Sequence, residues 1–219
     1  MKIIVINGSA RKNGNTATML KSYLEGASSV SDVIETKIVN LYELQYTGCI
    51  GCLGCKAKKG NNYGKCVVKD GIYDLLREVT SADAVVIGSP IYFGEITGQL
   101  RSFLERLVFP LYTYRLDQKI LTPKRFPVTM IYTMNVTKEM FDQIQLGTSL
   151  KRLEDLMERI FTTPDTLYAY NTYQVNNYDN YELEVFSEPA KAEHRRMQFP
   201  IDCQKAYDRG KKTAQSLLE

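Results

Sequence analysis

The N-terminal segment joins an apolar run, a polar loop and a helical pattern without interruption. Residues 3–6 are all isoleucine or valine, residues 8–16 are rich in glycine and asparagine, and apolar residues then recur at helical spacing from Met19 to Leu24. A loop that leads from a strand into a helix directs backbone N–H groups outward at the positive end of the helix dipole. The segment therefore predicts a strand, a loop that can hold a phosphate, and a helix.

The spacing within this loop does not match the two common nucleotide-binding motifs. Gly8 and Gly14 are one position further apart than the glycines of a nucleotide P-loop, and Asn15 stands where that motif has its lysine. The dinucleotide fingerprint G-x-G-x-x-G is also missing. A loop rich in Ser, Asn and Thr suits the compact dianion of a mononucleotide such as FMN, which needs neutral donors and no magnesium. The alternative is an ordinary strand-to-helix turn with a good N-cap.

The composition is that of one globular domain, which we expect to span residues 1–219. Of these residues 44% are hydrophobic and 24% are charged. A net charge of +3 without a basic stripe, and no apolar run of membrane length, argue against nucleic-acid and membrane partners. The first apolar run ends at Asn7, too early for an export signal, so a cytoplasmic location with reduced cysteines is expected.

Apolar runs alternate with helical patterns along the chain, which is typical of a parallel sheet covered by helices on both faces. Residues 3–6, 84–87 and 128–132 are near-continuous apolar runs, as central strands require, whereas 32–39 and 166–170 are mixed, as edge strands tolerate. The expected fold is a flavodoxin-like doubly wound α/β fold with a five-stranded parallel sheet of order 2-1-3-4-5. Its ligand crevice lies at the carboxyl ends of strands 1 and 3.

Helical patterns fill the gaps between these strands. Thr97 caps a helix through residue 109 whose apolar stripe leaves Arg106 facing elsewhere, and Asp70 opens a helix before the third strand. A longer helical stretch after the fourth strand is interrupted near Gly147.

The C-terminal region, about 187–219, reads as a helical arm. One helix is expected from about Pro189 and another after Pro200. The single histidine, His194, falls in this arm beside Arg195 and is expected to be exposed. A Ser-His or Cys-His hydrolytic site would therefore lack its base, which argues against hydrolysis.

A second loop with functional character follows the third strand. Residues 89–94 read Ser-Pro-Ile-Tyr-Phe-Gly and place two aromatic rings and free backbone amides at the expected crevice. An isoalloxazine ring needs a flat apolar wall with backbone donors beside it. Core packing of Tyr92 and Phe93 is the alternative. Residues 133–135, Thr-Met-Asn, end the fourth strand and reach the same rim.

These segments together resemble the NADPH-dependent FMN reductase family, including its iron-sulfur flavoprotein branch. The likeness rests on residues 8–16, 89–94 and 97–100, and it extends to Thr172-Tyr173-Gln174 and Phe199-Pro200, which is nearly the whole chain. It implies FMN held between loops 8–17, 89–94 and 133–135, NAD(P)H as electron donor, and a cytoplasmic homodimer or homotetramer with the flavin near the subunit interface. The candidate FMN-binding residues are Ser9, Arg11, Asn15, Thr16, Ala17, Pro90, Ile91, Tyr92, Phe93, Gly94, Thr133, Met134 and Asn135.

Four cysteines gather in one loop, residues 47–66. Cys49, Cys52 and Cys55 have C-x2-C-x2-C spacing, and Cys66 follows after ten further residues. Thiolates held together without histidine suit a 4Fe-4S cluster or zinc. The resemblance to the iron-sulfur branch implies a fourth cysteine closer to the third. The ten residues between Cys55 and Cys66 therefore depart from the pattern of that branch. Cysteines that merely pack or lie free are an equal alternative to the cluster, and zinc is a third.

The lysines of the cysteine loop and the isolated Cys203 need no metal cluster to explain them. Lysines 56, 58, 59 and 65 would offset the negative charge of a thiolate cluster, but a lysine run is also typical of a solvated face. Cys203 stands apart from the other cysteines and is expected to be a small buried hydrophobic residue.

Tyrosines are concentrated in two long connections. They either complete the ligand pocket and a subunit interface or simply cover the surface. The residues concerned are Tyr112, Tyr114, Tyr168, Tyr170, Tyr173, Tyr178 and Tyr181.

Three functions are open on these grounds. The first is an FMN-dependent oxidoreductase that takes electrons from NAD(P)H and passes them to a small acceptor such as a flavin or quinone. The second is an electron carrier in which a cysteine-bound 4Fe-4S cluster feeds FMN from a ferredoxin-like donor. The third is a non-redox binding module with structural zinc.

Overall fold

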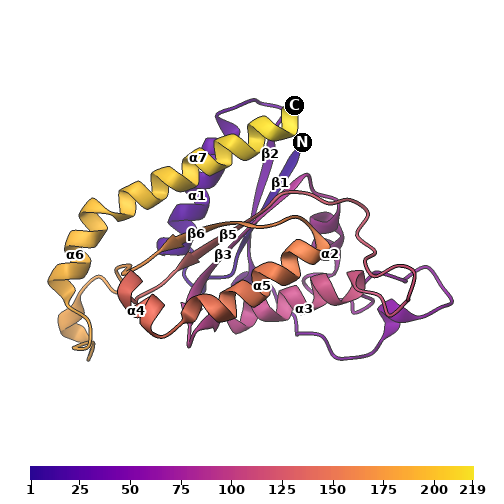
Figure 1. Cartoon of the computed structure of the whole chain (residues 1–219), viewed down its shortest axis with the longest axis horizontal. Coiled ribbons are helices and arrows are strands. Elements are labelled where there is room, and N and C mark those ends of the chain that lie inside the picture. The colour runs from indigo at the N-terminus through magenta and orange to yellow at the C-terminus, as the bar shows by residue number, and fades with distance from the viewer.

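The computed structural model describes residues 1–219 and has a parallel sheet with helices on both faces (Figure 1). The strands lie in the order β2-β1-β3-β5-β6, which confirms the predicted order 2-1-3-4-5. A further strand, β4, pairs antiparallel with the end of β3 and is too short for a sequence pattern to show. The strands are β1 Lys2–Asn7, β2 Glu35–Asn40, β3 Ala84–Tyr92, β4 Glu95–Ile96, β5 Val128–Thr133 and β6 Asp165–Ala169.

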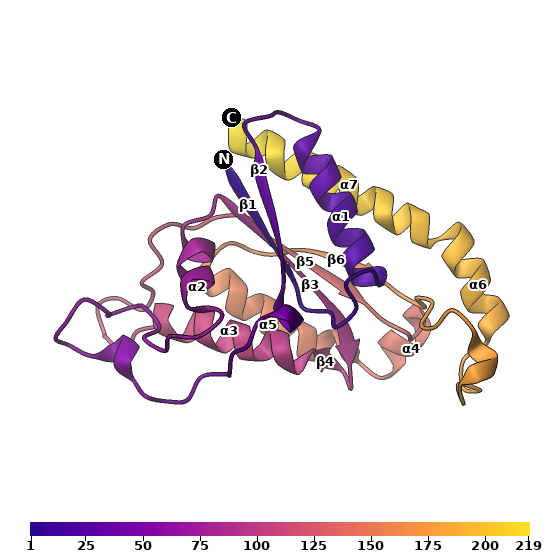
Figure 2. The same ribbon diagram turned by 180° about the vertical axis from the view of Figure 1, so that it is seen from behind.

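Helices α1 and α7 cover one face of the sheet, and α2, α3 and α5 cover the other (Figures 1 and 2). The helices are α1 Asn15–Ser28, α2 Tyr73–Thr80, α3 Gly98–Leu111, α4 Lys138–Gln143, α5 Leu146–Ile160, α6 Glu188–Met197 and α7 Phe199–Leu218. Short 3-10 turns occur at Leu41–Glu43, Gly54–Lys56 and Tyr178–Asn180. None of the helices combines the length and the apolar character needed to cross a bilayer.

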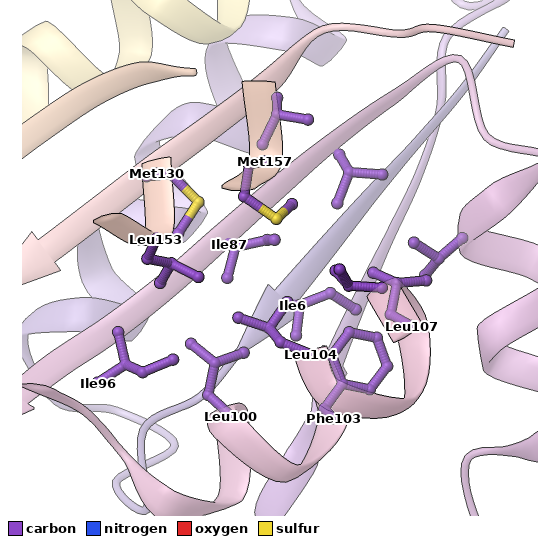
Figure 3. Packing of buried hydrophobic residues seen from close by; sticks show 14 of the residues in the cluster. Ile6, Ile87, Ile96, Leu100, Phe103, Leu104, Leu107, Met130, Leu153 and Met157 are labelled. Carbon is purple, nitrogen blue, oxygen red and sulfur yellow. The ribbon is translucent and has the colours of Figure 1, made fainter. Parts of the chain in front are cut away.

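Successive strand residues face opposite helical layers, because side chains alternate along a strand. Ile4 and Ile6 pack in a cluster with α2, α3 and α5, whereas Ile3 and Val5 pack in a second cluster against α1 and α7. Figure 3 shows the first cluster, in which strand side chains meet those of α3 and α5. The central strands are thus buried on both faces, as their continuous apolar runs predict.

Two predicted helix boundaries are wrong by a few residues. The side chain of Asp70 accepts a hydrogen bond from the N–H of Ile72 in a local turn, so the helix begins later, at Tyr73. The break predicted near Gly147 lies instead at Gln145, whose φ of 53° is left-handed and stops α4 from running on into α5.

Helix α7 lies directly against α1 (Figure 1). Two glycines permit the close approach: a Cβ added at Gly26 would lie 1.9 Å from the carbonyl oxygen of Tyr207, and one added at Gly210 would lie 1.9 Å from that of Tyr23. The hydroxyl of Tyr23 also hydrogen-bonds Thr213 at 2.7 Å. This contact fixes α7, and with it the preceding helix α6, to the rest of the fold.

Candidate functional site

The main cavity lies at the carboxyl ends of β1, β3 and β5, which is the position expected for a ligand in this fold. Its volume is about 960 Å³. Eleven of the predicted residues line it: Ser9, Arg11, Asn15, Thr16, Pro90, Ile91, Tyr92, Phe93, Thr133, Met134 and Asn135. Two do not line it: Ala17 is fully buried in the core between α1 and the sheet, and Gly94, the last residue of the loop 89–94, is not part of the lining.

The loop after β1 is built from short side-chain hydrogen bonds. The hydroxyl of Ser9 accepts from the N–H of Arg11 at 3.1 Å, and the N–H of Ser9 donates to Asn7 Oδ1 at 3.0 Å. The hydroxyls of Thr16 and Thr133 lie 2.7 Å apart, and both residues are buried. Only one of the two O–H groups can lie between these oxygens, so the other is free to donate to a ligand.

Two predicted phosphate-loop side chains contact a distant part of the chain. The guanidinium of Arg11 donates to the carbonyl oxygen of Gln174, and Asn15 Nδ2 donates to that of Tyr173 at 2.8 Å. The segment after β6 therefore crosses the phosphate loop and forms a further wall of the cavity. Tyr173 and Tyr181 lie in this wall, which is one of the two positions that the sequence allows for them. The other residues of the wall are not predicted: 172, 174–177, 180 and 186 together with Arg195 of α6.

The loop after β3 has a strained backbone. Phe93 has a φ of 50° and Gly94 a φ of 82°, so a bulky aromatic residue adopts the left-handed conformation. Pairing of Tyr92 with Glu95 across β3 and β4 holds the turn closed. Tyr92 is half exposed and Phe93 fully exposed, so neither packs in the core, and both rings are available at the cavity.

Asn135 provides an unpaired acceptor inside the cavity wall. Its Nδ2 donates to Gln174 Oε1 at 2.9 Å, which fixes the orientation of the amide. Its Oδ1 is buried and has no hydrogen-bond partner. A buried acceptor without a partner is costly, so this oxygen is suited to receive an N–H group from a bound ring.

The charge of the cavity favours an anion. Arg11 and Arg195 are the charged residues among its lining, and no acidic side chain lines it. The cavity volume lies within the range of cofactor sites, and its polar groups converge from three loops. Neutral donors, two cations and a free acceptor for a ring N–H fit a flavin mononucleotide.

The four loop cysteines line one small pocket at the other end of α3. Its volume is about 20 Å³. The insert between Cys55 and Cys66 folds back on itself, because the N–H of Gly64 donates to the carbonyl oxygen of Cys55 at 3.0 Å. The insert therefore returns Cys66 to the other three cysteines.

Arg106 lies beneath this pocket and corrects the sequence expectation. The helical pattern places it away from the apolar stripe, but its side chain is only 1% exposed, because the cysteine loop wraps around it. It pairs with Asp70, and its Nη groups donate to the carbonyl oxygens of Thr47 at 3.2 Å and Val68 at 2.8 Å. Its Nε lies 3.4 Å from the sulfur of Cys66. One guanidinium thus organises the whole loop.

The thiols as placed do not form a metal site. No group of three or more Cys, His, Asp or Glu side chains lies close enough together to hold a metal ion. Cys49 and Cys52 are exposed, whereas Cys55 is buried, and burial raises the pKa of its thiol. The four cysteines therefore line one pocket, but their sulfur atoms are not arranged as metal ligands.

The charge of Lys56 acts on the Cys55 thiol, as the sequence suggests, because it opposes the rise in pKa that burial causes. The hydrogen bonds of Lys56 lie elsewhere. Its ammonium donates to the carbonyl oxygens of Phe109 at 2.5 Å, Pro110 at 3.1 Å and Tyr112, where α3 ends. These carbonyls lack partners within the helix, so the lysine is used as a C-terminal cap. Lysines 58, 59 and 65 are exposed.

The tyrosines divide into three groups. Tyr173 and Tyr181 line the cavity, and Tyr178 packs against the ring of Tyr173 and accepts a hydrogen bond from the N–H of Gln174 at 3.0 Å. Tyr168 and Tyr170 pack against the core on the α5 side of the sheet. Tyr112 and Tyr114 belong to the connection after α3 and do not reach the cavity.

Two residues of the C-terminal arm are half-buried. His194 is expected to be exposed but is not, because α6 turns directly into α7. Burial lowers the pKa of its imidazole. Cys203 packs at the edge of the cluster under α7, and burial raises the pKa of its thiol. Neither residue lines the cavity.

The chain is similar to known flavoproteins. The model of the NADPH-dependent FMN reductase family matches residues 1–129. An iron-sulfur flavoprotein of Methanocaldococcus jannaschii is 35% identical over 106 residues, which are 48% of this chain and 51% of that protein. An iron-sulfur flavoprotein of Archaeoglobus fulgidus is 34% identical over 124 residues, 56% of this chain and 57% of that protein. The chain thus matches about half the length of these curated relatives.

Solved structures show the same fold. An FMN-dependent NADH-azoreductase of Bacillus anthracis, in complex with FMN, matches with a TM-score of 0.63 over 100% of both chains at 14% identity. The family model covers more than half of the chain and includes both the phosphate loop after β1 and the strained loop after β3. The chain therefore belongs to the NADPH-dependent FMN reductase family.

Proposed function

We propose that the protein is an FMN-dependent oxidoreductase that takes electrons from NAD(P)H and passes them to a small acceptor such as a flavin or quinone. The observation that carries the proposal is the cavity at the carboxyl ends of β1, β3 and β5, with two cations, no acidic lining residue and an unpaired buried acceptor at Asn135. Family membership supports the same activity. Self-association in the cytoplasm as a dimer or tetramer is part of the proposal, and the exposed Phe93 at the cavity rim supports it.

The roles of the cavity residues follow from their positions. Ser9 and Thr16, with backbone N–H groups at the start of α1, hold the phosphate. Asn135 accepts from the ring, and Tyr92 and Phe93 form an apolar wall that screens one ring face from water. Bound FMN would supply the two-electron hydride chemistry. Since no protein base is required for it, the absence of histidine from the cavity lining is consistent with the reaction.

Replacing Thr16 with alanine should weaken FMN binding by about 1 to 3 kcal/mol, or roughly 5- to 150-fold, because a phosphate oxygen loses a charge-assisted donor. Titration of the apoprotein with FMN, followed by flavin fluorescence, measures the change. Thr18→Ala is the matched control, since Thr18 is exposed on the same helix and does not line the cavity. Equal affinity in parent and Thr16→Ala, or release of FAD from the purified parent, would contradict the assignment.

An electron-carrier function is the second candidate. It is supported by the shared pocket of Cys49, Cys52, Cys55 and Cys66 and by the iron-sulfur flavoprotein names of the two relatives. For this function Cys49, Cys52, Cys55 and Cys66 would hold a 4Fe-4S cluster, which would supply a relay for electrons from a ferredoxin-like donor to FMN. Structural zinc in the same pocket, without redox activity, is a third. The anaerobic visible spectrum distinguishes them: flavin bands alone, flavin with broad iron-sulfur absorbance, or no colour.

We expect a variant with serine at Cys49, Cys52, Cys55 and Cys66 to keep FMN and to be reduced by NADPH or NADH at near the parent rate. The reason is that the pocket lies at the far end of α3 from the cavity, and none of its residues lines the cavity. The assay is anaerobic bleaching of the flavin, with Cys203→Ser as control. A variant that holds FMN but resists every nicotinamide that reduces the parent would establish the electron-carrier function instead.

A further inference from the structure

Lys191 is a lysine buried beside the cavity. It lies on α6, and only 1% of its surface is exposed. Its ammonium donates to the backbone oxygen of Asn135 at 2.7 Å, to Asn171 Oδ1 at 2.9 Å and to the backbone oxygen of Thr172 at 3.5 Å. Its three N–H groups are thereby used to join the loop after β5 to the segment after β6.

All of these acceptors are neutral. No carboxylate pairs with the ammonium, and burial lowers the pKa of Lys191 to about 8. The ring of Phe186, 4.8 Å from Nζ, gives only a cation–π contact. A buried charge without a counter-charge is costly, and proteins normally pair such groups. The protein as folded therefore has an unneutralised positive charge at this place.

The cavity is next to the Lys191 ammonium, so a negative group bound there would lie close to this charge. Asn135 and Thr172, which hold the ammonium, and Phe186, which covers it, all line the cavity. The cavity contributes no acidic side chain of its own. An anion that binds in the cavity would thus lie behind a single layer of residues from the ammonium, in surroundings where charges are weakly screened.

We propose that Lys191 is a positioning residue whose fixed positive charge is neutralised by the anion bound in the cavity, so that the C-terminal arm and the cofactor stabilise each other. The inference rests on the proposed function, because FMN is the anion considered. FMN offers two negative groups of this kind: its phosphate and the ring in its reduced, anionic form. Helices α6 and α7 lie outside the part of the chain that the family model matches.

The test uses three variants of the full chain. Lys191→Met keeps the length of the stem but removes the charge and the donors, whereas Lys191→Gln removes the charge and keeps two amide donors on a shorter stem. Lys211→Met is the control, because Lys211 is exposed on α7. For each protein, the affinities for FMN and riboflavin, the flavin midpoint potential, and the thermal unfolding of apo and FMN-bound protein are measured.

Both Lys191 variants should lose at least tenfold in binding of the anionic form, and Lys211→Met should match the parent. If the phosphate is the partner, FMN affinity falls and riboflavin affinity does not. If the reduced ring is the partner, the midpoint potential falls by about 30 mV for each tenfold loss in a two-electron couple. The Lys191→Met apoprotein should lose stability with its three hydrogen bonds. The rise in unfolding temperature that FMN causes should be smaller than in the parent.

The outcomes that overturn the inference are distinct from failure of the proposed function. Parent-like affinity and potential in both Lys191 variants would overturn it, and so would full rescue in Lys191→Gln, since hydrogen bonds rather than charge would then suffice. Should Lys191→Met fail to fold, a Lys191→Gln protein with parent-like FMN affinity and potential still overturns it. A parent protein that binds neither FMN nor riboflavin would refute the proposed function itself.

Discussion

Gly210→Ala should lower the free energy of unfolding by about 3 kcal/mol or more, at the upper end of what overpacking costs. The added Cβ would lie 1.9 Å from the carbonyl oxygen of Tyr23, and the obstacle is backbone, which cannot rotate away. The helices must then separate, which also weakens the hydrogen bond between Tyr23 and Thr213. The gain in helix propensity from glycine to alanine, about 1 kcal/mol, does not offset this. Denaturant unfolding with a constant m-value measures the change.

Gly98→Ala is the control for this substitution. It makes the same change in a helix, but an added Cβ at Gly98 meets nothing within 4 Å, so stability should stay the same or rise slightly. Gly210→Ala should also weaken FMN binding, because α7 seats α6 and its Lys191 at the cavity. Equal stability of the two alanine variants would show that α1 and α7 can slide apart at little cost.

The sheet could be predicted because its physical signals are local. Strands buried on both faces must be continuous apolar runs, and residues 3–6, 84–87 and 128–132 show this directly. The mixed patterns of residues 32–39 and 166–170 then place these two strands at the edges, which gives the order. The loops at the cavity follow for the same reason, since each comes immediately after a central strand.

The wall formed by residues 172–186 and Arg195 could not be predicted in this way. It reaches the phosphate loop through hydrogen bonds between Asn15 and Tyr173 and between Arg11 and Gln174, which are about 160 residues apart in sequence. Pairs so distant in the chain have no local sign in a single sequence. The local signal in this segment is its tyrosines, of which Tyr173 and Tyr181 line the cavity, but tyrosines fit a pocket wall and a solvated surface equally well.

The burial of Lys191 and Arg106 also could not be predicted from the sequence. A lysine or arginine in a helical pattern is normally solvated, and Lys191 and Arg106 have the same local pattern as exposed neighbours. Each is buried because a distant loop closes over it and supplies carbonyl oxygens.

Helix α3 connects the cavity with the cysteine pocket. Thr97 at its start donates to the carbonyl oxygen of Gly8 at 2.7 Å, and Arg106 near its end holds the cysteine loop.

Arg106→Met should lower the free energy of unfolding by about 3 to 5 kcal/mol, the usual cost of removing one partner of a buried ion pair. Asp70 would keep a mostly buried carboxylate without its cation, and the carbonyl oxygens of Thr47 and Val68 would lose their donors. Arg101→Met is the control on the same helix. Its ion pair with Glu95 is exposed, so the loss should be at most about 1 kcal/mol.

The damage from Arg106→Met should be confined to the cysteine loop. Hydrogen exchange of residues 47–70 should become fast, and Cys55 should become reactive toward a thiol reagent, because its burial depends on the loop. Exchange in residues 8–16 and the affinity for FMN should change little, since the cavity shares no residue with the cysteine pocket. Loss of FMN from a variant that stays folded would mean that α3 couples the two sites, so that ordering of the cysteine loop is a condition for building the cavity.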